Sequence, residues 1–294
     1  MKTHSQSIRR GFTLVELMVA MAITTIMMTI LISITAYALD SWNRSRAEVR
    51  AARQAQAMTE IMARDFEAMV TRSGNNFEWF VATAGDRVGT GVSQSPNSAD
   101  LIFFTAATDR YDGAIGTATD QGGDISAVSY SLRFQDPMAG LGGGNQQFPT
   151  FVLYRKLVNP DLTFQNLLGR ENLQAAFSQY ESQLDDMANF VCENVYQFSV
   201  TFHVDYTEII GGRAVETSTR VTLSPSDNRE IRLRGNQLIA APLPENGRIG
   251  AVELSITVLS DTAMNAIRNN QNVSEDFISR NSFQYSKRVE IPRM

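Results

Sequence analysis

Cysteine and histidine are scarce in this chain of 294 residues. The single cysteine, Cys192, cannot form an intrachain disulfide, and the two histidines are His4 and His203. His4 lies in a short basic stretch at the N-terminus, so a catalytic Ser-His-Asp or Cys-His arrangement could use only His203. A metal site built from several histidines is likewise excluded within one chain. We therefore expect no cofactor and no resident metal.

An excess of positive charge is also absent. The chain has 31 acidic and 26 basic side chains, and its formal net charge is −5. Binding to nucleic acid requires a basic patch that neutralises phosphates. The composition therefore argues against nucleic acid as a partner.

Glycine and proline are missing from residues 12–73, and ionisable side chains other than Tyr37 are missing from residues 17–39. About 23 residues, each rising roughly 1.5 Å in a helix, span a hydrocarbon core of about 30 Å. A secretory signal peptide is the alternative, but its apolar region is about 7–15 residues long and ends at a small-residue cleavage site. The sequence therefore predicts a membrane-spanning helix. Basic residues without acids favour a cytoplasmic N-terminus, but Arg44, Arg46, Arg50 and Arg53 weaken this count, so the orientation rests partly on a family resemblance.

One carboxylate, Glu16, stands inside the first part of this apolar run. An ionised side chain in a membrane is unfavourable unless it is paired or neutralised. An ordinary signal anchor gives no reason for an acid at this position. We therefore expect Glu16 to need a cationic partner.

The hexapeptide GFTLVE at residues 11–16 follows a basic leader and precedes the apolar helix. In this it resembles the processing site of type IV pilin-like precursors. The resemblance implies that a prepilin peptidase cuts between Gly11 and Phe12 and methylates the new N-terminal amine of Phe12. It also implies that the Glu16 carboxylate pairs with the Phe12 amine of a neighbouring subunit during assembly.

The same resemblance implies a location and a set of partners. The chain would be a single-pass protein of the inner membrane, with a cytoplasmic N-terminus and a periplasmic C-terminal domain, and would be extracted into a pilus-like filament. Its partners would be the prepilin peptidase, other major and minor pilin-like subunits, an inner-membrane assembly platform and membrane lipid. A structural role without catalysis follows.

Helix-forming residues dominate beyond the apolar run, so we expect the helix to continue to residue 73. Apolar side chains recur there at spacings of three and four, which predicts a stripe that packs on a globular domain. The stripe comprises Ala51, Ala55, Met58, Met62, Phe66 and Met69. The predicted parts are a leader (1–11), the transmembrane half of the helix (12–39), its exported half (40–73) and a globular domain (74–294).

Short apolar or alternating runs predict strands in the remainder of the chain. They cover residues 99–106, 125–134, 151–158, 190–206, 252–258 and 283–291. We expect surface helices within residues 164–189 and irregular structure over residues 207–249. A helical block followed by strands and loops indicates an α+β fold, in which a long N-terminal helix packs on a pilin-like domain with an antiparallel sheet.

Two groups of side chains were considered as chemical sites. Cys192 and His203 fall on opposite faces of the strand predicted over residues 190–206, with His203 on the polar face, which argues against a Cys-His nucleophile. A polar loop could gather oxygen ligands for calcium but lacks the D-x-[DN]-x-[DN]-G pattern, so a solvated loop is favoured. Its acidic residues are Asp109, Asp112, Asp120 and Asp124.

The order of the predicted elements resembles the J-type minor pseudopilins of type II secretion systems. The matching pieces are residues 100–104 (DLIFF), 152–157 (VLYRKL), 195–202 and 252–258, the Leu243-Pro244 turn, and a terminal strand that ends near Pro292. Retention of Glu16 separates the chain from K-type subunits, which lack that acid. Long insertions at 107–124, 136–149 and 160–189 depart from a compact J-type domain. A variant with such insertions could belong to a verrucomicrobial cassette of exported pilin-like proteins.

Three alternatives remain open at this stage. A minor pilin of a type IV pilus, used in adhesion, motility or DNA uptake, shares every feature up to residue 73. A membrane-anchored surface-binding module could use aromatic side chains near Trp79 to bind a glycan, although a buried tryptophan is the commoner explanation. A tethered hydrolase would need His203 beside a nucleophile and an acid, which the strand pattern does not support.

Overall fold

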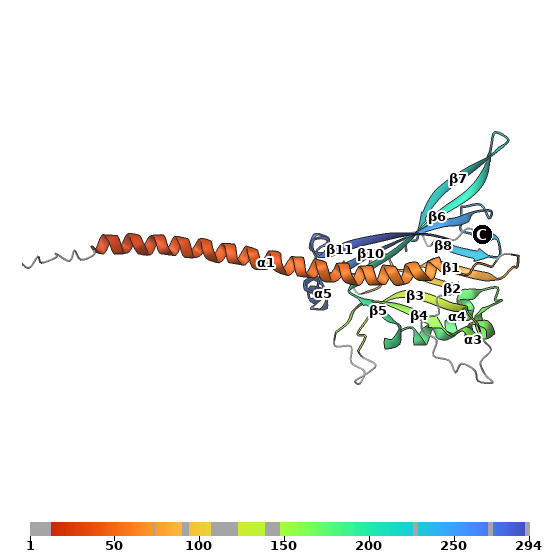
Figure 1. The fold of residues 1–294 in the computed structure, drawn as a ribbon, viewed down its shortest axis with the longest axis horizontal. Coiled ribbons are helices and arrows are strands. Elements are labelled where there is room, and N and C mark those ends of the chain that lie inside the picture. The colour runs from red at the N-terminus through yellow and green to blue at the C-terminus, as the bar shows by residue number, and fades with distance from the viewer. Residues whose placement is uncertain are drawn as a thin grey trace, which may run out of the picture. The chain divides into compact units, whose positions relative to one another are not determined.

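The computed structural model describes residues 13–72, 74–89, 94–106, 123–138, 148–225, 229–269 and 273–291. It divides the chain into two compact units, Met1–Val49 and Arg50–Met294. The first element is one long helix, α1 (Leu14–Glu67), whose residues contribute to both units. A globular part with antiparallel sheets follows it (Figure 1), so the predicted α+β class is confirmed.

The first unit consists, in its described residues, of the helix alone. Every large apolar side chain that it carries between Leu14 and Leu39 is exposed. This is the one helix among the described residues that is long and apolar enough to cross a membrane. An exposed apolar surface of this length needs lipid or other helices around it, as the sequence predicts.

The last part of α1 belongs to the core of the second unit. The predicted stripe is confirmed, because Ala51, Ala55, Met58, Met62 and Phe66 are each at most 3 % exposed. The helix ends earlier than residue 73, however, at Glu67. Beyond it the backbone pairs with strand β2 (Ala99–Thr105): the Val70 N–H donates to the Phe104 carbonyl at 2.8 Å. This pairing satisfies the backbone groups that a longer helix would have used.

The larger sheet has seven strands in the order β5-β4-β3-β2-β1-β8-β9, and every neighbouring pair is antiparallel. Beside β2, its strands are β1 (Glu78–Ala84), β3 (Ser126–Gln135), β4 (Thr150–Val158), β5 (Phe190–Glu193), β8 (Glu230–Arg234) and β9 (Gln237–Ile239). One face of this sheet contacts α1, since Phe66 stacks on Phe103 with ring centroids 4.6 Å apart.

The smaller sheet has four strands in the order β11-β10-β6-β7. They are β6 (Val195–Ile210), β7 (Arg213–Thr222), β10 (Arg248–Leu259) and β11 (Ser282–Glu290). Its apolar face meets the larger sheet, where the Phe202 ring lies edge-on to Phe80 with centroids 5.6 Å apart. Two short helices between β10 and β11, which the sequence analysis did not predict, are α5 (Asp261–Arg268) and α6 (Glu275–Arg280). Ser260 and Ser274 cap their N-termini.

Two predictions about this region were wrong. The strand predicted over residues 190–206 is interrupted at Asn194, whose φ of 61° turns the chain from β5 in one sheet into β6 in the other. Residues 207–249 are not irregular. β6 continues to Ile210 and forms a hairpin with β7, and β8 forms a second hairpin with β9. The side chains of β7 are exposed on both faces along much of its length, so the strand lacks the apolar alternation that would have revealed it.

The insertion at residues 160–189 forms short helical turns that cover the outer face of the larger sheet. They are α3 (Pro160–Leu162), η2 (Thr163–Leu167), α4 (Leu173–Phe177), η3 (Ser178–Gln183) and η4 (Met187–Asn189). The prediction of surface helices was incomplete, since Leu173, Phe177 and Leu184 are at most 3 % exposed. Glu78 at the start of β1 holds this layer by accepting the Leu173 N–H at 2.8 Å.

A buried ion pair fixes α1 on the larger sheet. Arg155 of β4 donates to both carboxylate oxygens of Asp65 in α1, Nε to Oδ2 at 2.7 Å and Nη2 to Oδ1 at 2.8 Å. The Tyr130 hydroxyl of β3 donates to the same Oδ2 at 2.5 Å. All three residues are at most 2 % exposed. Burial, followed by the Asp65 charge, raises the pKa of Tyr130 well above its ordinary value, so this hydroxyl remains a donor.

We predict that Asp65→Ala destabilises the folded domain by about 3–5 kcal/mol, because it leaves the Arg155 charge buried without its carboxylate. The double variant Asp65→Leu/Arg155→Met is expected to lose much less folding stability, since it removes both charges. Denaturant unfolding of the detergent-solubilised full chain measures both. Glu60→Ala is the control, because its ion pair with Lys287 is exposed and its loss should change little. An Asp65→Ala effect as small as the control would contradict a dominant role for the pair.

Candidate functional site

The N-terminal end of α1 is closed by a reciprocal pair of hydrogen bonds between Thr13 and Glu16. The Thr13 hydroxyl accepts the Glu16 backbone N–H at 3.2 Å, and Glu16 Oε2 accepts the Thr13 backbone N–H at 2.9 Å. Oε2 also accepts the Thr13 hydroxyl at 3.0 Å. This is a capping box, and the pattern Thr-x-x-Glu at the start of an apolar helix is its sequence signal. Only a cationic partner was predicted for Glu16, so Thr13 is a second, local partner that the prediction did not include.

Both Thr13 bonds end on the same carboxylate oxygen of Glu16. Oε1 accepts no hydrogen bond from the described residues of the chain. A carboxylate can accept up to about four hydrogen bonds through its two oxygens. Glu16 can therefore cap its own helix and still accept a donor from outside. The expected processing positions, Gly11 and Phe12, lie outside the described residues.

The polar side chains along the apolar part of α1 are satisfied within the helix. Their hydroxyls donate to carbonyls one turn back, at 2.7–2.9 Å. They belong to Thr24, Thr25, Thr29, Ser33 and Thr35. No water is available in a bilayer core, so internal partners of this kind are what a spanning helix requires. Glu16 is thus the one charged side chain in the described stretch from Thr13 to Leu39.

Residues 7–32 match the family model of the prokaryotic N-terminal methylation motif. This motif is that of type IV pilin-like precursors. The match covers the N-terminal segment alone, and it supports a pilin-like precursor with an apolar anchoring helix. Comparison of the whole chain with curated proteins and with solved structures gave no match.

Cys192 and His203, the candidate nucleophile and base, lie in different sheets. Cys192 is in β5 of the larger sheet and His203 in β6 of the smaller one, so they do not share a strand as the sequence analysis expected. His203 does lie on the polar face with Glu253, its Nε2 3.7 Å from Glu253 Oε2. His203 as a residue is only 8 % exposed, however, and thus buried among its neighbours. The structure does not bring the two residues together.

Acidic residues do not gather into a cation site in the described part of the chain. No group of three or more His, Cys, Asp or Glu side chains there could hold a metal. Of the four aspartates in the loop considered for calcium, only Asp124 is described, and Asp109, Asp112 and Asp120 lie outside the described residues.

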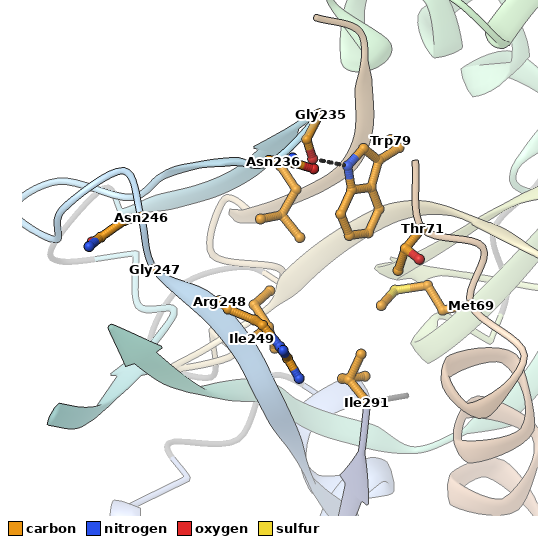
Figure 2. A pocket seen from close by; sticks show the side chains of 11 residues that line it. Met69, Thr71, Trp79, Gly235, Asn236, Asn246, Gly247, Arg248, Ile249 and Ile291 are labelled. Carbon is orange, nitrogen blue, oxygen red and sulfur yellow. Dashed lines mark hydrogen bonds between the residues drawn. The ribbon is translucent and has the colours of Figure 1, made fainter. Parts of the chain in front are cut away.

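A cavity of about 370 Å³ lies in the second unit beside Trp79. Figure 2 shows the indole pointing towards the β8–β9 turn, where its Nε1 donates to the Gly235 carbonyl at 2.9 Å. The walls are Met69, Thr71, Trp79, Leu233, Gly235, Asn236, Asn246, Gly247, Arg248, Ile249 and Ile291. Arg248 is the one ionisable side chain among them, and it cannot be deprotonated. The cavity can admit a small, mainly apolar group but offers no acid or base for catalysis.

We predict that Cys192 does not react with thiol reagents at pH 8 in the folded protein. Its side chain is 3 % exposed, and burial, with a smaller effect of Glu193, raises the pKa of the thiol to about 12. The reactive thiolate is therefore almost absent. Alkylation followed by mass spectrometry, with and without denaturant, measures this. Rapid labelling of the folded chain would contradict the buried position of Cys192.

Proposed function

We propose that this chain is a non-enzymatic minor pilin or pseudopilin. In this proposal a prepilin peptidase cleaves the precursor between Gly11 and Phe12 and methylates the amine of Phe12. The mature chain then enters a pilus-like filament, or its tip complex, through the helix that begins at Phe12. The observation that carries the proposal is the methylation motif at residues 7–32, which runs directly into an exposed apolar helix with one acid.

Glu16 is proposed as the assembly residue. Cleavage after Gly11 would create a cationic amine on Phe12, which needs an anion in an apolar surrounding. Glu16 is the one charged side chain of the described apolar segment, and its Oε1 accepts no hydrogen bond from the described residues. A charge-assisted hydrogen bond between the amine of one subunit and Glu16 of the next would satisfy both charges.

The domain division and the topology are proposed on the same grounds. The leader (1–11) would stay cytoplasmic, residues 12–39 would cross the inner membrane, and residues 40–73 would continue into the exported domain (74–294). A globular part of this size suits a subunit used in few copies, since a major subunit must pack hundreds of times. Neighbouring genes would separate the two systems: an outer-membrane secretion channel and sister pseudopilins favour type II secretion, and a retraction ATPase favours a type IV pilus.

The cavity beside Trp79 supports a second candidate, a membrane-anchored surface-binding module. Trp79 is only 5 % exposed and its indole N–H is already bonded within the chain. A glycan would therefore find little aromatic surface to stack upon, which favours the filament subunit.

One prediction from the proposed function concerns processing. Intact mass spectrometry of the protein from membranes that contain a prepilin peptidase should show loss of residues 1–11 and one added methyl group. Membranes without the peptidase should yield the full chain, and Gly11→Val should block the cut. An uncut chain in the presence of an active peptidase would overturn the proposal and leave an anchored binding module.

Another prediction separates the charge of Glu16 from its capping role. Glu16→Gln retains a side-chain acceptor for the capping box but loses the charge. Thr13→Val removes the capping hydroxyl but keeps the charge. We expect both variants to insert and to be cleaved, Glu16→Gln to enter filaments at least about tenfold less, and Thr13→Val to enter nearly normally. Immunoblots of sheared filament and membrane fractions measure this, and equal entry of Glu16→Gln and wild type would exclude charge pairing.

A further inference from the structure

Strand β7 leaves one edge of the smaller sheet open. It pairs with β6 over ten residue pairs without a bulge, and no strand of the described chain lies on its other side. Seven of its ten residues are exposed, and the hairpin projects from the body of the domain (Figure 1). An unpaired edge of this length presents a row of backbone N–H and C=O groups to another strand.

The other sheet edges are less suited to such pairing. In the larger sheet, the edge strands β5 and β9 have only four and three residues. In the smaller sheet, β11 carries Lys287 and Arg288, and Lys287 forms an ion pair with Glu60 of α1. Short strands and cations are common means of protecting an edge. β7 is ten residues long, and its cations Arg213 and Arg220 leave the central Thr217-Ser218-Thr219 uncharged.

The sequence of β7 is complementary to itself when it is read in the opposite direction. Residues 215–221 are VETSTRV, which is a palindrome about Ser218 apart from the exchange of Glu216 for Arg220. In an antiparallel pair of identical strands centred on Ser218, Glu216 of each copy lies opposite Arg220 of the other. Valine then faces valine, and threonine faces threonine.

The side chains are distributed correctly for this arrangement. Glu216, Ser218 and Arg220 share the polar face of the sheet, because their partners in β6 are Thr207, Asp205 and His203. Val215 and Val221 share the opposite face, which carries the core residues Phe202 and Val204. Pairing would thus form two Glu-Arg pairs on one face and cover Val215, now 40 % exposed, on the other. In the described residues neither Glu216 nor Arg220 has an ion-pair partner.

We propose that β7 pairs with β7 of a second copy of this chain, antiparallel and centred on Ser218, and joins two four-stranded sheets into one. A two-fold contact of this kind closes on itself, so it cannot propagate along a filament. This step rests on the proposed function, in which chains outside a filament are held in the membrane, and the dimer belongs to those chains. One strand pair buries less than the roughly 1,000 Å² of a stable interface, so tethering in the membrane supplies the effective concentration.

Cysteine cross-linking tests this pairing. Residues opposite each other in an antiparallel pair have Cα atoms about 4.5–5.5 Å apart, within the range of a disulfide. Ser218→Cys in the full chain, in membranes under mild oxidation, should give a disulfide-linked homodimer. Ser286→Cys is the matched control, because Ser286 is an exposed serine on the other edge strand of the same sheet. We expect at least about tenfold more dimer from Ser218→Cys, and Cys192, buried in both, does not contribute.

The charge pairs give a second, independent readout. Added to Ser218→Cys, Glu216→Arg should lower dimer formation several-fold, because like charges then face each other. Adding Arg220→Glu to that variant should restore it, because opposite charges face again. Equal cross-linking of Ser218→Cys and Ser286→Cys, a failure of the double exchange to restore the dimer, or a disulfide to a different protein would each overturn the proposal.

Discussion

The contact between Asp65 and Arg155 is the constraint on which the globular domain depends. A helix with a stripe of alanine and methionine can slide along an apolar sheet at little cost, since these side chains fit many surroundings. A bidentate pair between α1 and β4, closed by the Tyr130 hydroxyl, permits one register only. Any shift would leave a buried charge without its partner, which is far more costly than an imperfect apolar contact.

This register determines where the other layers can lie. With Phe66 stacked on Phe103, the chain leaves α1 at Glu67 and pairs with β2 instead of continuing as a helix. The opposite face of the larger sheet then needs its own cover, which the turns at residues 160–189 provide through Phe177 and Leu184. Glu78 attaches that layer to the sheet as Asp65 attaches α1. Its buried carboxylate accepts the Leu173 N–H, and its Oε2 lies 3.4 Å from Arg232 Nη1.

Sequence patterns predicted the parts of this structure that local periodicity controls. The apolar helix, its buried stripe and most strands follow from side-chain spacing, and the GFTLVE segment follows from its own motif. Asp65 and Arg155 could not be paired in advance, because residues ninety positions apart carry no local signal of contact. β7 was missed because both of its faces are largely polar, and the break at Asn194 because a positive φ at a non-glycine residue is uncommon. The capping box was predictable, since Thr13 and Glu16 fit its pattern.

The capping box also changes how a carboxylate can be kept in an apolar helix. If Glu16 had no partner before assembly, its insertion would be unfavourable and a distant cation would have to be present from the start. The Thr13 N–H and hydroxyl instead satisfy Oε2 locally. A neighbouring amine then needs only Oε1, so the proposed subunit contact adds a bond without breaking one. The free energy of such a contact comes from joining two charges, and this is why removing the charge and removing the cap should have different consequences.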